Sequence, residues 1–163
     1  MSDFTFSLVL PSWIAQWYVH RCGGLSPVRT PKGSVESIII QRFSRPKSEA
    51  SAPDTGAEGA IMIIFPENKA KPTAVYNYFP DSAKKILARS ISDQFNLCLF
   101  NDIVRPLFNN ALKSDLIWAW MEENGIERTE TNWLGIEKRY SRMRENLLRS
   151  RRVQKTRKKT SEL

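Results

Sequence analysis

Two segments in the first half of the chain have the hydrophobic pattern of β-strands. From Phe4 to Leu10 apolar residues alternate with other residues at a period of two, as in a strand with one more apolar face. Residues 60–66 form a short apolar run that Pro66 closes, which is typical of a buried strand. We expect the segments 4–10 and 60–66 to pair, and residues 75–79 are a candidate third extended segment.

The same region contains two helical patterns. Ser12 is placed to cap a helix that stops at the glycine pair 23–24, because serine favours an N-cap and glycine a C-terminal stop. Ser34 is placed to cap a second helix in the same way. The residues expected on one face of that second helix are Val35, Ile38, Ile39 and Phe43.

The second half of the chain is helical in pattern throughout. Residues 82–104 have a helical apolar stripe, although the pattern does not show whether they form one helix or two. A further helix over 114–123 is apolar nearly all round, which predicts deep burial, and Gly125 stops it. A last long helix starts near Thr131. Its apolar stripe consists of Trp133, Ile136, Tyr140, Met143 and Leu147.

These elements predict an α+β protein that is mostly helical, with a small two- or three-stranded sheet. Residues 1–80 would form an α+β N-terminal part, and the Ser- and Pro-rich segment 44–59 a mobile loop. Residues 81–148 would form a helical unit. A buried helix, a glycine-containing turn and a basic amphipathic helix together resemble a helix-turn-helix, although this turn is longer than the tightest ones. Residues 149–163 would be a basic, flexible tail.

The positive charge of the chain is concentrated at its C-terminal end. The formal net charge is +8, yet residues 1–137 carry 14 Lys/Arg and 15 Asp/Glu. Residues 138–163 carry 11 Lys/Arg and only two Asp/Glu, a net of +9. A neutral body with one strongly cationic end indicates a polyanionic partner or a solvated tail.

The principal hypothesis is therefore non-catalytic binding of nucleic acid, with duplex DNA preferred and RNA left open. Helical periodicity places Lys138, Arg142 and Arg149 opposite the apolar stripe. The amides at the start of this helix, beside Thr129 or Thr131, would also suit a phosphate. The candidate binding residues are Lys138, Arg139, Arg142, Arg144, Arg149, Arg151, Arg152, Lys155, Arg157, Lys158 and Lys159.

Two other function classes stay open. The chain could be a protein-interaction or structural subunit of an assembly, with its tail on RNA or an acidic partner. Its docking face would then consist of Trp13, Trp17 and Tyr18. Alternatively, Asp54 and the Glu67-Asn68-Lys69 triplet imitate the carboxylate-and-lysine pattern of metal-dependent nucleases. Pro66 weakens that match, because it breaks the strand just before Glu67.

The remaining features argue against membranes, metals and catalysis. No apolar run reaches 18 residues and the first residues lack a signal-peptide pattern, so we expect a soluble, cytoplasmic protein without membrane contact. His20 and Cys22 could offer two metal ligands, but no paired ligand spacing completes a site. We expect no cofactor, no metal and no catalytic residue, since no nucleophile motif or phosphate-binding loop is present.

Several short motifs lie near the C-terminal end: the stretch Glu127 to Thr131, Asn132-Trp133 and the run from Glu137 to Arg144. They resemble the ends of a group of uncharacterised small proteins carried by bacterial mobile elements and prophages. The resemblance extends to Leu10-Pro11, Gln16-Trp17 and the run Tyr76–Pro80. It implies a bacterial, DNA-associated role in regulating or handling a mobile element, and it implies no catalytic residues.

Overall fold

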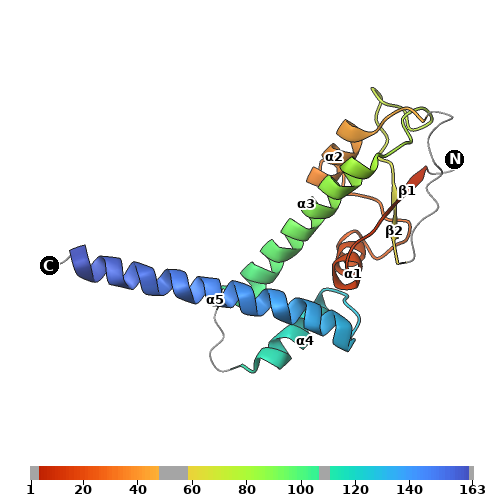
Figure 1. Cartoon of the computed structure of the whole chain (residues 1–163). Helices are drawn as coiled ribbons and strands as arrows, with labels where there is room; N and C mark the ends of the chain where they lie inside the picture. The colour runs from red at the N-terminus through yellow and green to blue at the C-terminus, as the bar shows by residue number, and fades with distance from the viewer. Residues whose placement is uncertain (1–3, 48–58, 107–110, 162–163) are drawn as a thin grey trace. The chain divides into compact units, whose positions relative to one another are not determined.

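The computed structural model describes residues 4–47, 59–106 and 111–161, and the side chains as far as residue 154 (Figure 1). It is mostly helical with a small antiparallel sheet, so the α+β prediction is confirmed. In chain order the elements are β1 (Thr5–Leu8), α1 (Ser12–Arg21), α2 (Val35–Phe43), β2 (Ile61–Ile64), α3 (Asp81–Leu99), the short π-helix η1 (Phe100–Val104), α4 (Lys113–Glu123) and α5 (Glu130–Ser161).

The chain divides into two compact units, Met1–Phe95 and Asn96–Leu163. The boundary lies inside α3, later than the division between residues 80 and 81 that the sequence suggested. The sequence pattern changes from mixed to helical near residue 81, but the first turns of α3 pack within the first unit, which contains the sheet. Each unit is described by itself below.

The sheet of the first unit consists of the two expected strands. β1 and β2 pair antiparallel, with Thr5 opposite Ile64 and Leu8 opposite Ile61. The segment 75–79 does not join them, because Tyr78 pairs with Arg45 in an isolated bridge instead. Of the two alternatives left open by the sequence, the structure shows the two-stranded sheet among the described residues, and the candidate segment adds no strand to it.

The ends of α1 and α2 test three sequence predictions. Ser34 caps α2 as predicted, since its Oγ accepts the Ser37 amide at 3.1 Å. Ser12 does not cap α1: it is the first residue of the helix, and its Oγ accepts from the Gln16 side chain. The glycine pair after α1 has φ values of 98° and 75°, a left-handed conformation that stops a helix as predicted.

The buried face of α2 differs from the predicted one. Val35 and Ile38 are more than half exposed, whereas Glu36, Ser37 and Ile40 are buried. The Gln94 side chain of α3 donates a hydrogen bond to the Glu36 carboxylate. This bond satisfies the buried carboxylate of Glu36. The spacing of apolar residues alone cannot predict that a charged residue lies on the buried face.

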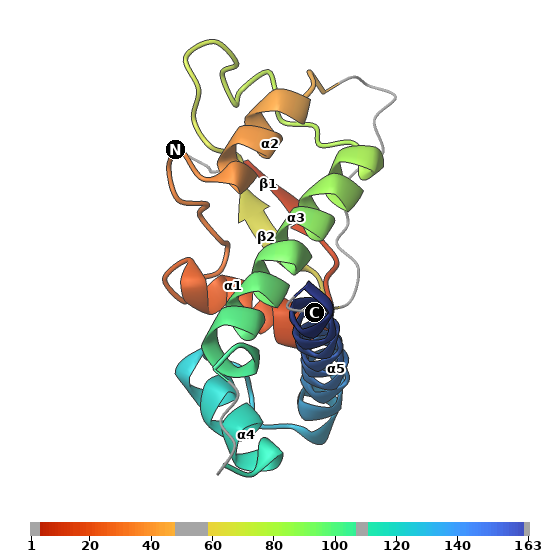
Figure 2. The ribbon, with the colours of Figure 1, turned by 90° about the vertical axis from the view of Figure 1, so that its left-hand side faces the viewer.

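Aromatic side chains fill the core of the first unit. The Phe6 ring centroid lies 4.9 Å from that of Phe65 and 4.4 Å from that of Phe79. Trp17 meets Phe95 of α3 edge to face, with centroids 5.5 Å apart. Figure 2 shows α3 crossing in front of the sheet, which covers it on that side.

The second unit starts with the last turn of α3, which passes without a break into η1, and α4 and α5 follow. α4 buries Ile117, Trp120 and Met121 but exposes Ala119, so the predicted deep burial holds for one side of the helix only. The indole Nε1 of Trp120 donates to the Asp102 carboxylate of η1 at 2.9 Å. Gly125, with φ of 65°, ends α4 as predicted.

Candidate nucleic-acid interface

The apolar side of α5 anchors this helix within the second unit. Ile136 and Tyr140 are 0% and 1% exposed, and the Trp133 ring stacks on Trp118 of α4 at a centroid distance of 6.1 Å. The predicted stripe is therefore the packed side, with Met143 and Leu147 partly buried along it. A helix held in this way presents its opposite side to solvent.

The first turn of α5 is polar but not cationic. Thr129 caps it, since its Oγ1 accepts the Asn132 amide at 3.3 Å. The buried Asn132 side chain donates to the Glu127 carbonyl. Glu127, Arg128 and Glu130 are all exposed at this end, and together they carry a net charge of −1. The start of α5 therefore does not add to the positive charge of the helix.

The outward side of α5 carries the cations that helical periodicity predicts. Lys138, Arg142 and Arg149 are exposed, and Arg152 is exposed on the same side. At 100° per residue these four positions fall within a sector of about 80°. At a rise of 1.5 Å per residue they extend over about 21 Å of helix. We call these four residues the cationic face.

Arg139 lies beside this face but is engaged inside the protein. Its Nη1 donates to Oδ1 of Asn96 at 2.6 Å. Burial, and to a lesser extent the neighbouring Arg142, lowers the pKa of Arg139. A half-buried guanidinium with an internal acceptor helps to fix α5 in place, so Arg139 is less accessible than the exposed cations beside it.

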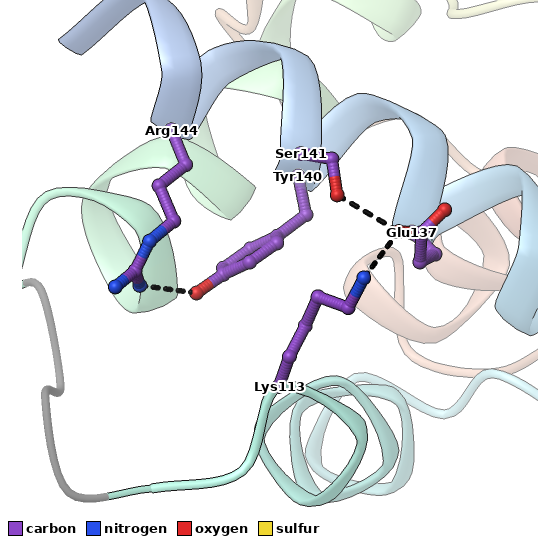
Figure 3. Close-up of polar contacts among 5 residues, drawn as sticks. All are labelled: Lys113, Glu137, Tyr140, Ser141 and Arg144. Atoms are coloured by element: carbon purple, nitrogen blue, oxygen red, sulfur yellow. Dashed lines mark hydrogen bonds and ion pairs between the residues drawn. The ribbon is translucent and has the colours of Figure 1, made fainter. Parts of the chain in front are cut away.

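A second polar cluster links α5 to the start of α4 (Figure 3). The Glu137 carboxylate accepts from the Lys113 ammonium at 2.6 Å and from the Ser141 hydroxyl at 2.8 Å. The Arg144 Nη1 donates to the Tyr140 hydroxyl at 2.7 Å. Because Lys113 bonds to Glu137, and Ser141 adds a second bond, the pKa of Glu137 lies below its ordinary value.

Arg144 borders a shallow groove of about 420 Å³ on this side of the unit. Lys113, Ser141 and Leu148 also line it. The one bond from Arg144 to Tyr140 uses one of the five N–H groups of a guanidinium. The Arg144 guanidinium therefore has N–H groups that this bond does not use, and such groups are suited to a phosphate oxygen.

One carboxylate interrupts the cationic face. Glu145 pairs with Arg149 at 3.3 Å, with both side chains about seven-tenths exposed. A pair of this kind, four residues apart on a helix surface, contributes about 0.3–0.5 kcal/mol. A phosphate group could exchange with Glu145 at little cost, so this pair does not remove Arg149 from the cationic face.

The C-terminal cations continue along the same helix. α5 extends to Ser161 and runs well past α4 in Figure 1, so the segment expected to be a flexible tail is helical there. Arg151 is exposed like Arg152. The side chains of the other candidates lie outside the described residues, namely those of Lys155, Arg157, Lys158 and Lys159.

The alternative sites receive little support from the described residues. Trp17 and Tyr18 are each 2% exposed and belong to the core, so of the predicted docking face on α1 only Trp13 is partly exposed. Of the nuclease pattern, Asp54 lies outside the described residues, and the exposed Glu67 accepts from the Thr73 hydroxyl. In the described part of the chain no three His, Cys, Asp or Glu side chains are grouped to hold a metal. Nor is any helix there long and apolar enough to cross a membrane.

Sequence reasoning missed two residues that shape this interface. Lys113 reaches Glu137 across 24 positions, and Asn96 reaches Arg139 across 43. Neither stands in a motif, and separations of this size cannot be deduced from local periodicity.

The chain matches no protein-family model, and neither a curated protein nor a solved structure matches it.

Proposed function

We propose that the second unit binds nucleic acid, duplex DNA by preference, through the cationic face of α5. The observation that carries the proposal is the exposure of Lys138, Arg142, Arg149 and Arg152 along one side of a helix whose other side is packed. Neutralising phosphates with these side chains releases condensed counterions, which drives binding in a salt-dependent way. No catalytic step is part of this function.

Duplex DNA is favoured over single strands by the absence of aromatic residues on this face. The only aromatic residues of α5 are Trp133 and Tyr140, which pack against the body of the unit. Proteins that bind single strands stack bases on exposed aromatic rings. An α-helix about 10–12 Å across fits the major groove of B-DNA instead, and arginine pairs well with guanine edges and phosphates.

The middle and end of α5, rather than its first turns, would contact the duplex. A helix-turn-helix reads bases with the first residues of its recognition helix. Here those turns carry the exposed Glu130 and the Glu137–Lys113 pair. The cationic face begins only at Lys138, so α5 would lie against the DNA as an extended basic helix.

The resemblance to small proteins of mobile elements agrees with a DNA-associated role, and a role in regulating or handling such an element remains a proposal. In the alternative function, the chain is a subunit of an assembly, and the same cationic face binds RNA or an acidic protein. Burial of Trp17 and Tyr18 leaves only Trp13 partly exposed on the docking face that this alternative uses, so the proposal of nucleic-acid binding is preferred.

Fluorescence anisotropy with the full chain separates these cases. The probes are a duplex DNA, a single-stranded DNA of the same sequence and a single-stranded RNA, each at a low and a high salt concentration. The proposal expects tightest binding to the duplex and weaker binding at high salt. Equal binding to all three probes would refute the preference for duplex, and no binding to any of them would refute the function.

A further inference from the structure

The first unit contains a cavity of about 450 Å³ that the proposed DNA binding does not use. It lies between the edge of the sheet at the end of β2, the start of α2 and the loop that precedes α2. Its lining combines apolar side chains, hydroxyl groups and charged groups. This volume lies within the range of sites that hold small organic molecules.

The polar lining is asymmetric in charge. Arg29 and Lys32 both line the cavity and are exposed, so their charged ends can reach its mouth. Glu67 is the one carboxylate among the lining residues, and its Oε1 already accepts from the Thr73 hydroxyl at 2.7 Å. The positive end of the α2 dipole adds to the two cations, since Ser37 in the first turn of α2 is also a lining residue. The cavity therefore attracts an anion.

Two hydroxyl groups of the lining have unused hydrogen-bonding capacity. The Oγ1 of Thr30 is buried and has no hydrogen-bond partner among the described residues. Ser37 is 2% exposed and accepts from the Gln41 amide at 3.4 Å, but no acceptor for its own hydrogen is described. A buried polar group without a partner costs about 1–3 kcal/mol, which a ligand oxygen would relieve.

The apolar part of the lining indicates what carries the anionic group. The apolar residues Phe4, Ile64, Phe65 and Pro66 line the wall. Phe65 is 3% exposed and fixed against Phe6, whereas Phe4 is 40% exposed. A flat apolar ligand body would cover the exposed part of Phe4, whereas a bare inorganic ion would leave it in contact with water.

We propose that this cavity binds a small organic anion, in which a phosphate monoester or carboxylate is attached to an aromatic or similarly flat apolar body. Arg29 and Lys32 hold the anionic group, the hydroxyls of Thr30 and Ser37 donate to it, and Phe4 covers the apolar body. The site is separate from the cationic face of α5, so the two proposals can fail independently.

The test is a titration of the full chain with phenyl phosphate and with benzoate, followed by NMR amide shifts and by thermal unfolding. Benzyl alcohol is the neutral control ligand, and inorganic phosphate is the control without an apolar body. Concentrations up to about 10 mM suit a site of millimolar affinity, because a ligand of the folded state then stabilises it measurably. The proposal expects shifts at Thr30, Ser37 and Phe65 with one or both aromatic anions, and their comparison identifies the preferred anionic group.

Variants distinguish this site from loose binding to other cations. The pair Arg29→Gln and Lys32→Gln should weaken binding at least about five-fold, since each removed cation ends a charge-assisted hydrogen bond. The matched pair Arg42→Gln and Lys85→Gln alters exposed cations of the same unit outside the cavity and should leave affinity unchanged. Phe4→Ala changes a partly exposed ring, so the fold should persist, and it should weaken phenyl phosphate more than inorganic phosphate.

Three results would each overturn the proposal. The first is equal binding of benzyl alcohol, which would show a purely apolar site. The second is equal loss of affinity in the two double variants, which would show binding to general surface charge. The third is the absence of shifts at the lining residues with either aromatic anion.

Discussion

Arg139 and Asn96 are joined by a hydrogen bond of 2.6 Å from the guanidinium Nη1 to the amide Oδ1. The bond connects the middle of α5 to the last turn of α3 within the second unit. Three residues further on, Arg142 is exposed and belongs to the cationic face. The two arginines thus differ in role. Arg139 holds the helix in place, whereas Arg142 is accessible to solvent or to a ligand.

A first prediction compares these two arginines. Arg139→Gln should destabilise the protein by about 1–3 kcal/mol, because it removes a charge-assisted bond and leaves Asn96 without this donor. Arg142→Gln should change stability by less than about 0.5 kcal/mol, as is usual for an exposed position, but should weaken DNA binding. Urea unfolding and anisotropy titrations of both variants measure the two effects. The reverse assignment, with Arg142 the more destabilising change, would contradict the structure.

A second prediction concerns pH and the Lys113–Glu137 pair. The carboxyl of Glu137 has a lowered pKa, so the unfolded chain takes up its proton at a higher pH than the folded chain does. The resulting stabilisation is complete above the ordinary value of 4.5 and is lost as the pH falls through the lowered pKa. Lys113→Gln should therefore cost about 0.5–1 kcal/mol near neutral pH and progressively less below about pH 4.5.

The control for this prediction is Lys85→Gln, a change at an exposed position of the first unit that has no partner among the described residues. Chemical unfolding is measured for both variants and the parent chain across the acid range. A deficit for Lys113→Gln that stays constant from neutral to acid pH would show that Glu137 is not the group responsible.

A third prediction tests the anchoring of α5. Ile136 is 0% exposed, so Ile136→Ala should destabilise the protein by about 2–5 kcal/mol through lost contacts and a residual cavity. Leu134, two residues earlier, is 43% exposed, and Leu134→Ala should cost less than about 1 kcal/mol. Denaturation midpoints of the two variants decide this. Similar costs for both would mean that the assigned packed side of α5 is incorrect.

Local periodicity was sufficient to predict most secondary structure. The strand pairing follows from two apolar segments, and the cap at Ser34 and the stop at Gly125 follow from backbone preferences of single residues. The packed stripe of α5 follows from the spacing of Ile136 and Tyr140. Each of these features depends on residues close together in the sequence.

The features that were missed depend on distant partners. The buried side of α2 is set by Glu36 and its bond to Gln94, 58 positions away, rather than by its aliphatic residues. The bond that engages Arg139 comes from Asn96, and nothing near Arg139 in the sequence distinguishes it from Arg142. The sequence therefore predicted which side of α5 carries the cations. It did not predict which of these cations are engaged inside the protein and which are exposed.

The central claim, that the exposed cations of α5 bind duplex DNA, is tested most directly by the salt dependence of binding in two matched triple variants of the full chain. One replaces Lys138, Arg142 and Arg149 with Gln, and the other replaces Lys85, Arg42 and Arg89. Arg89 pairs with Asp93 four residues away, as Arg149 does with Glu145. Both triples remove three exposed charges and one such pair, so they are equal in net charge.

The measured quantity is the slope of log K against log salt concentration for a duplex probe. If three phosphate contacts are lost, the slope of the α5 triple should be shallower by about 2.7 than that of the parent chain, with weaker binding throughout. The Lys85 triple should keep the parental slope. An unchanged slope in the α5 triple, or an equal change in both, would contradict the account.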